Sequence, residues 1–270
     1  PLWVQYSRYF GNFITGDAGE SLKFGLPVTE LVARRLANTF ILVGPGIVLG
    51  YILGSFFGLL MGRNRGSLLD NYGVFPVTVL GTVPEFFIGI LLVIVFSTIL
   101  GWFPSSGALS LEASRQLGQD YSLLQMWSHP SFAYHYVLPF STVMLRYLFL
   151  PTLIMRTSVV EVSGQDFSYY NRIKGLTQRT QLKHLTKHAS LPVITVLPAS
   201  LTRAIGGMVL IEVVFNWPGI GKLLIDSVLF RDIPVVQFVF FLVAVWVILG
   251  NYIVDLMYSV IDPRITVEGA

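Results

Sequence analysis

The sequence has 270 residues, of which 53% are apolar and 12% charged, and its formal net charge is +3. This composition excludes an ordinary soluble domain, in which about a quarter of residues are charged. The absence of cysteine excludes disulfides and thiolate metal sites. The largest cluster of basic residues falls in one loop between apolar stretches, so membrane orientation explains it better than nucleic-acid binding.

Five apolar stretches are each long enough to cross a bilayer, which takes about 20 helical residues. We expect an all-α, polytopic membrane protein with a region outside the membrane at 1–35, a transmembrane domain at 36–260 and a tail at 261–270. In the second stretch, Thr82-Val83-Pro84-Glu85 is typical of a capping box. The predicted spans cover residues 36–62, 72–102, 136–160, 191–215 and 234–258.

The loops differ in their content of lysine and arginine, which predicts their side of the membrane. The loop after the first span carries Arg63 and Arg65, and the loop at 161–190 is strongly basic. The other two loops hold one arginine, or basic residues balanced by aspartates. We therefore expect the basic loops and the C-terminus in the cytoplasm and Pro1 outside, which predicts one further span before Pro1.

The 161–190 loop is too polar to span and has the pattern of two short helices. Residues 166–174 form the first predicted helix, Gly175 suits a left-handed position after it, and Thr177 suits the N-cap of the second. Leu182, Leu185 and Ala189 then fall on one face of the second helix, flanked by basic residues. From the residues alone, this ridge fits equally a groove in a partner protein or an anionic membrane surface.

Two stretches look like ligand motifs but lack essential residues. Gly219-Ile-Gly-Lys222 lacks the first glycine and the final hydroxyl of a phosphate-binding loop, so it is interpreted as a turn. His184-Leu-Thr-Lys-His188 has leucine where a zinc protease has glutamate. We therefore expect no catalytic residues, no metal site and no nucleotide bound by this chain.

Several motifs follow one another along the chain, and together they resemble the permease subunits of binding-protein-dependent ABC importers, in the dipeptide, oligopeptide and nickel branch. The resemblance covers nearly the whole chain. The motifs are Glu161-Val-Ser-Gly-Gln-Asp166, Lys174-Gly-Leu176, Leu191-Pro-Val193, Phe215-Asn-Trp-Pro-Gly-Ile-Gly-Lys-Leu-Leu-Ile-Asp226, Arg231-Asp-Ile-Pro-Val-Val-Gln237, Asp255-Leu-Met-Tyr258 and Asp262-Pro-Arg-Ile265.

The resemblance implies a six-helix permease fold, five helices of which are visible, in the cell membrane of a prokaryote. It implies a second homologous permease, two ABC ATPase subunits that use ATP and Mg, and an extracytoplasmic solute-binding protein. ATP hydrolysis would then reside in the separate subunits, and this chain would not be an enzyme. The solute is expected to be a di- or oligopeptide, with an oligosaccharide or chelated nickel as alternatives. A stand-alone channel or secondary carrier is the alternative class.

The resemblance also assigns expected roles to residues. The 161–190 loop is expected to couple to the ATPase, although Tyr169, Tyr170 and Asn171 stand where many importers have Glu-Ala-Ala. The expected coupling residues are Glu161, Asp166, Tyr170, Arg172, Lys174, Gly175, Leu176, Arg179 and Leu182. The expected external turn or gate consists of Trp217, Pro218, Gly219 and Gly221.

An ionisable group within a span must face a cavity or a partner, and four charged residues in the predicted spans are candidates for the pathway or a gate. They are Glu85, Arg146, Arg203 and Glu212. We expect Arg146 and Arg203 to line the pathway and attract a solute carboxylate, with Glu85 binding an amino group or pairing with an arginine. The alternative is an internal Glu–Arg pair that only holds helices together. Glu212 is expected to have a structural or gating role.

Overall fold

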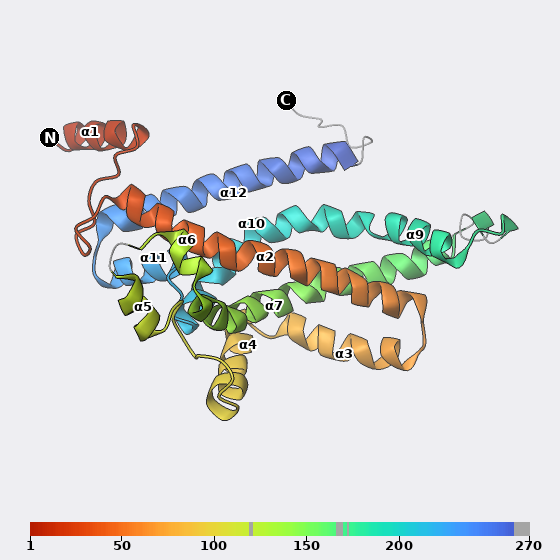
Figure 1. Ribbon diagram of the computed structural model, residues 1–270. Coiled ribbons are helices and arrows are strands. Elements are labelled where there is room, and N and C mark those ends of the chain that lie inside the picture. Colours follow the sequence, from red (N-terminus) through yellow and green to blue (C-terminus); the bar gives the residue numbers. More distant parts are fainter. Residues whose placement is uncertain (119–120, 166–169, 172, 262–270) are drawn as a thin grey trace. The chain divides into compact units, whose positions relative to one another are not determined.

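The computed structural model describes residues 1–118, 121–165, 170, 171 and 173–261, and this part of the chain is helical with no strand beyond an isolated bridge between Glu20 and Pro27. Figure 1 labels the helices along the chain. They are α1 (Leu2–Ile14), α2 (Val28–Arg63), α3 (Leu68–Thr82), α4 (Glu85–Leu92), the π-helix η1 (Val93–Ile99), α5 (Leu111–Leu117), α6 (Leu123–Ser128), α7 (Pro130–Ser163), α9 (Gln178–Ala189), α10 (Leu191–Val214), α11 (Ile220–Leu229) and α12 (Ile233–Ile261).

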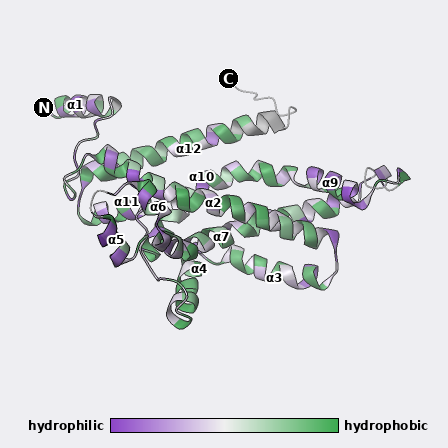
Figure 2. Ribbon diagram, in the orientation of Figure 1, coloured by the Kyte–Doolittle hydropathy of each residue, from purple (hydrophilic) through white to green (hydrophobic). Residues whose placement is uncertain are grey.

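Among the described residues, three helices are long and apolar enough to cross a membrane, namely α2, α7 and α12. Two bent pairs pass the same test, one formed by α3 with the segment Glu85–Ile99 and one formed by the two parts of α10. Counting each bent pair as one span gives up to five candidate spans in this part of the chain. Figure 2 shows apolar residues along these helices and hydrophilic residues in α5, α9 and the turn between α2 and α3.

The predicted capping box at Thr82-Val83-Pro84-Glu85 is wrong. Thr82 is the last residue of α3, its hydroxyl donates to the Val79 carbonyl at 3.0 Å, and Val83 is extended with ψ 134°. Proline disfavours helical geometry in the residue before it and has no N–H to continue the helix. The chain therefore bends by 107° between α3 and the segment Glu85–Ile99.

The chain divides into two compact units, which are described separately. The first unit contains Pro1–Val43, Gly89–Pro139 and Ala204–Leu249. Its core packs the start of α2 with α11 and the start of α12, and Phe13 of α1 contacts Phe238 and Phe241 of α12 edge-on. The buried core residues are Ala18, Val28, Leu31, Val32, Ile220, Leu223, Val235 and Val239.

The second unit contains Gly44–Ile88, Phe140–Arg203 and Gly250–Ala270. Its main feature is a row of glycines on α2, every fourth residue, that faces α7. A methyl group added to any of them would lie 2.4 to 2.7 Å from an atom of α7. At four of the five positions this atom is a backbone carbonyl oxygen. Small residues at such spacing let two helix backbones approach closely in a membrane. The glycines are Gly46, Gly50, Gly54, Gly58 and Gly62.

Candidate functional site

The second helix of the 161–190 loop forms as predicted, because local sequence signals determine it. Gly175 has a φ of +64°, in the left-handed region that favours glycine. The Thr177 side chain accepts a hydrogen bond from the Thr180 N–H at 3.4 Å and caps α9, which ends at Ala189. The predicted first helix includes Asp166, Tyr169 and Arg172, which lie outside the described residues.

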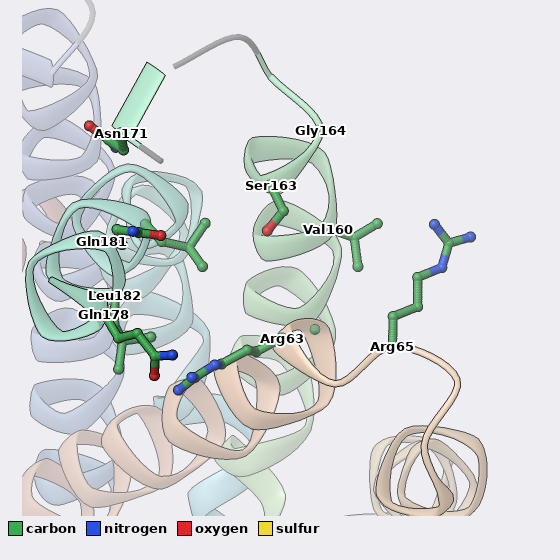
Figure 3. A pocket seen from close by; sticks show the side chains of 11 residues that line it. Arg63, Arg65, Val160, Ser163, Gly164, Asn171, Gln178, Gln181 and Leu182 are labelled. Atoms are coloured by element: carbon green, nitrogen blue, oxygen red, sulfur yellow. The ribbon is translucent and has the colours of Figure 1, made fainter. Parts of the chain in front are cut away.

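A pocket of about 600 Å³ lies at the base of this loop, within the second unit. Figure 3 shows Arg63 extending toward Gln178 of α9, whereas Arg65 lies on the other side of Val160. The pocket is lined by the ends of α2 and α7 together with α9, through Gly62, Arg63, Arg65, Val160, Ser163, Gly164, Asn171, Gln178, Gln181, Leu182 and Leu185.

The predicted apolar ridge of α9 lies on the side of the helix that borders this pocket. Leu182 and Leu185 line the pocket and are half-buried, and Ala189 is fully buried. The hydrophobic effect favours covering the part of Leu182 and Leu185 that is still exposed. The exposed residues of the loop include the charged residues Glu161, Lys174, Arg179, Lys183 and Lys187, together with Tyr170 and Ile173, which are 59% and 63% exposed.

An ion pair fixes the α2–α3 turn to α7 in the same unit. Arg156 donates from Nε to Asp70 Oδ1 at 2.5 Å and from Nη2 to Oδ2 at 3.0 Å. Asp70 is 2% exposed and also accepts the Gly66 N–H at 3.0 Å. A bidentate guanidinium–carboxylate pair holds both side chains in one orientation. The turn at 64–67 therefore keeps a fixed position beside the helix that leads into the coupling loop.

Arg156→Ala is expected to destabilise the protein by about 2 kcal/mol, because Asp70 would be left buried without its partner. The measurement is the thermal unfolding midpoint in detergent, with Lys183→Ala on exposed α9 as the control. Replacing both partners by apolar residues, as in Asp70→Leu with Arg156→Met, should recover much of the lost stability. Equal midpoints for Arg156→Ala and the control would show that the pair does not stabilise the fold.

In the first unit, the predicted external turn is organised around Glu212, which is fully buried. Thr39 Oγ1 donates to Glu212 Oε1 at 2.5 Å, and the Lys222 N–H donates to Oε2 at 3.0 Å. The Ile220 N–H donates to Thr39 Oγ1 at 2.9 Å. Glu212 and Thr39 thus satisfy N–H groups at the start of α11, where a negative charge is favourable.

The residues of the turn itself are held by Asn38 on α2. Asn38 Nδ2 donates to the Pro218 carbonyl at 3.0 Å, and Trp217 Nε1 donates to the Asn38 carbonyl at 3.0 Å. Trp217 is fully buried, and a methyl group on Gly219 would lie 2.0 Å from Glu212 Oε1. These residues form a packed turn in which a side chain at position 219 would overlap the Glu212 carboxylate.

The remaining predicted charges are also placed. Arg146 Nε lies 3.4 Å from Glu85 Oε2, with side chains 35% and 24% exposed, so these two residues form an ion pair. Arg203 is exposed and donates from Nε to the Ala199 carbonyl of its own helix at 3.2 Å. The structure thus brings Glu85 and Arg146 together, and Glu212 belongs to the turn in the other unit.

Several residues that organise these regions were not predicted from the sequence, chiefly Asn38, Thr39, Asp70, Asp232 and the glycine row. Asp232 is fully buried and accepts hydrogen bonds from Ser21 Oγ and the Leu22 and Lys23 N–H groups. Asp70 and Asp232 pair with residues far away in sequence, so no local signal identifies them. The four-residue spacing of the glycines is visible in the sequence and was a signal that could have been used.

Comparison with known proteins gives a consistent result. A family model described as "Binding-protein-dependent transport system inner membrane component" matches residues 46–267. The chain is 34% identical to the oligopeptide transport system permease protein AppB of Bacillus subtilis, over 98% of this chain and 81% of that protein. It is 34% identical to the di/tripeptide transport system permease protein DppB of Pseudomonas aeruginosa and 33% identical to the glutathione transport system permease protein GsiC of Salmonella paratyphi A, each with 98% of this chain covered.

One solved structure supports the fold. The crystal structure of an amino acid ABC transporter with histidines aligns with a TM-score of 0.58 at 13% sequence identity, covering 85% of this chain and 93% of that chain. At this identity the likeness concerns the fold alone.

Proposed function

The chain belongs to the family of binding-protein-dependent transport system inner membrane components and is an ABC importer permease, and from this premise we propose that it forms one half of a pathway for di- and oligopeptides. The observation that carries the peptide assignment is similarity over nearly the whole chain to permeases named for oligopeptides, di/tripeptides and glutathione. The partners are a second homologous permease, two ATPase subunits that use ATP and Mg, and an extracytoplasmic solute-binding protein.

The orientation proposed for the chain follows from its charges. The second unit contains Arg63 and Arg65 as well as the basic 161–190 loop, so these segments face the cytoplasm together with the C-terminus. The turn around Trp217 to Gly221 then faces outward. This places the coupling loop beside the ATPase and the Glu212-centred turn beside the solute-binding protein.

The coupling loop is proposed to transmit movement between the ATPase and the spans. The exposed basic residues Lys174, Arg179, Lys183 and Lys187 would meet the ATPase, whereas Leu182 and Leu185 border the pocket that the ends of α2 and α7 also line. A domain movement that displaces α9 would act on the spans α7 and α10, between which it lies in the chain. The tight glycine contacts make α2 and α7 move as one body in the second unit.

Co-purification and inhibition test this proposal. A tagged version of the chain is expected to bring down a nucleotide-binding subunit, and peptide uptake into proteoliposomes by the complex should stop with vanadate. A tagged chain that yields no nucleotide-binding subunit and transports peptide in the presence of vanadate would be a stand-alone carrier, and the proposal would fail.

Arg203 gives the sharper test of the proposed pathway charges, because Arg146 already has Glu85 as a partner. If Arg203 attracts a peptide carboxylate in the pathway, Arg203→Ala should lower peptide uptake by at least about tenfold, the loss expected for a charged hydrogen bond of about 1.5 kcal/mol. The affinity of the solute-binding protein should stay unchanged. Uptake by correctly inserted Arg203→Ala that equals that of Arg8→Ala, an exposed arginine on α1, would contradict the assignment.

A further inference from the structure

The first unit contains a second pocket, of about 220 Å³, directly beside the Glu212-centred turn. Its walls come from the segment before α2, the first turns of α2, the start of α6 and the turn residue Pro218. Asn38, whose side chain donates to the Pro218 carbonyl, also lines it. The pocket therefore shares residues with the turn.

Two arginines of α2 line this pocket. Arg34 is exposed, and its Nη2 donates to the Tyr121 carbonyl at 3.3 Å. Arg35 is half-buried, and no carboxylate oxygen of the described residues lies within 4.0 Å of its side chain. A half-buried guanidinium without a close anion is costly in free energy, so the pocket favours a negatively charged guest.

The acids that act electrostatically on Arg35 already accept hydrogen bonds from other donors. Glu212 and Asp226 act on Arg35 electrostatically. Glu212 accepts hydrogen bonds from Thr39 Oγ1 and the Lys222 N–H, while Asp226 accepts one from Lys222 Nζ at 2.8 Å. Arg35 therefore retains hydrogen-bond donors that neither acid uses.

The rest of the pocket defines which anion suits it. Glu30, one helical turn before Arg34, lines the same pocket and offers an acceptor for an ammonium group. Leu31, Leu123 and Met126 supply apolar surface. A simple inorganic anion would use only the arginines, whereas a zwitterion with an apolar side chain would satisfy all three kinds of surface.

We propose that this pocket is a loading site for a terminus of the transported peptide, in which Arg35, supported by Arg34, binds the C-terminal carboxylate. The proposal rests on the peptide function and outward orientation proposed above. The turn residue Pro218 and Asn38 of α2, which donates a hydrogen bond to it, both line the pocket. A bound peptide would therefore contact the turn directly before it enters the spans.

The test uses the complete transporter with its binding protein in proteoliposomes, and compares uptake of dialanine with uptake of dialanine amide. Arg35→Gln is expected to lower the ratio of free-acid to amide uptake by about tenfold, because only the free acid uses the guanidinium. Arg35→Lys keeps the positive charge, so its ratio of free-acid to amide uptake should stay close to that of the wild type. Because each variant uses the same binding protein, the preference of that protein cancels in the comparison.

Arg115→Gln, an exposed arginine on α5, is the matched control and should leave the ratio unchanged. If Arg35→Gln does not assemble, Arg34→Gln at the exposed position replaces it, with a smaller fall in the same direction expected. An unchanged ratio in an assembled and active variant overturns the loading site and leaves the peptide function standing. Failure of the wild-type complex to take up either peptide contradicts the proposed function, and the loading site with it.

Discussion

Replacing Gly54 by leucine is expected to lower the stability of the permease by about 3 kcal/mol, through overpacking of the contact between α2 and α7. A methyl group at this position would already lie 2.5 Å from the Leu148 carbonyl oxygen and 2.7 Å from Pro151 Cγ. Backbone oxygen cannot move aside without shifting α7, and the neighbouring glycine contacts would open as well. The measurement is the thermal unfolding midpoint in detergent, where a fall of roughly 6–10 °C corresponds to this loss.

A matched pair of alanine substitutions separates packing from helix propensity. Gly44 lies on the same helix, but a methyl group there would meet nothing within 4 Å. Gly44→Ala should therefore be neutral or slightly stabilising, since alanine favours helix by about 0.5–1 kcal/mol over glycine. Gly54→Ala should be destabilising. The close contact between α2 and α7 is refuted if the two alanine variants unfold at the same temperature.

Glu212→Ala is expected to destabilise the first unit by about 3 kcal/mol. The substitution removes the acceptor of the Lys222 N–H and of Thr39 Oγ1, both in a region where Trp217 and Phe215 are buried. It also leaves a cavity beside Gly219, whose Cα packs against the carboxylate. The expected readouts are a lower unfolding midpoint and faster amide hydrogen exchange at the start of α11.

Glu212→Gln keeps the shape of the side chain and one acceptor oxygen, so it should lower the stability of the first unit less than Glu212→Ala does. Glu112→Ala removes an exposed glutamate in the first unit and is the control. Protection of the α11 amides that stays at the wild-type level in Glu212→Ala would contradict the assigned role. The turn would then be held by Asn38 and Trp217 alone.

Local signals predicted the parts of the structure that depend on adjacent residues. Gly175 and Thr177 fix the start of α9 because one supplies a left-handed backbone and the other a side-chain cap. The apolar stretches predicted five spans because their length matches a bilayer. The break near Pro84 was also visible, but Thr82 belongs to the preceding helix and the expected capping box does not form.

Contacts between distant residues could not be predicted in the same way. The sequence does not indicate that Asp70 pairs with Arg156, or that Glu212 receives hydrogen bonds from Thr39 and Lys222. The apolar face of α9 could be predicted from the spacing of its residues, but the residues opposite it could not. Leu182 and Leu185 border a pocket that is also lined by Gly62, Arg63 and Val160, which are distant in sequence.

The central claim is that this chain conducts peptides only as part of an ATP-driven complex. The most direct measurement is uptake of a labelled dipeptide into proteoliposomes that contain the complete complex, with and without the binding protein and with and without ATP. We expect uptake of the dipeptide only when the binding protein and ATP are both present. Addition of vanadate should abolish this uptake. Accumulation of the dipeptide by the isolated chain without ATP would contradict it.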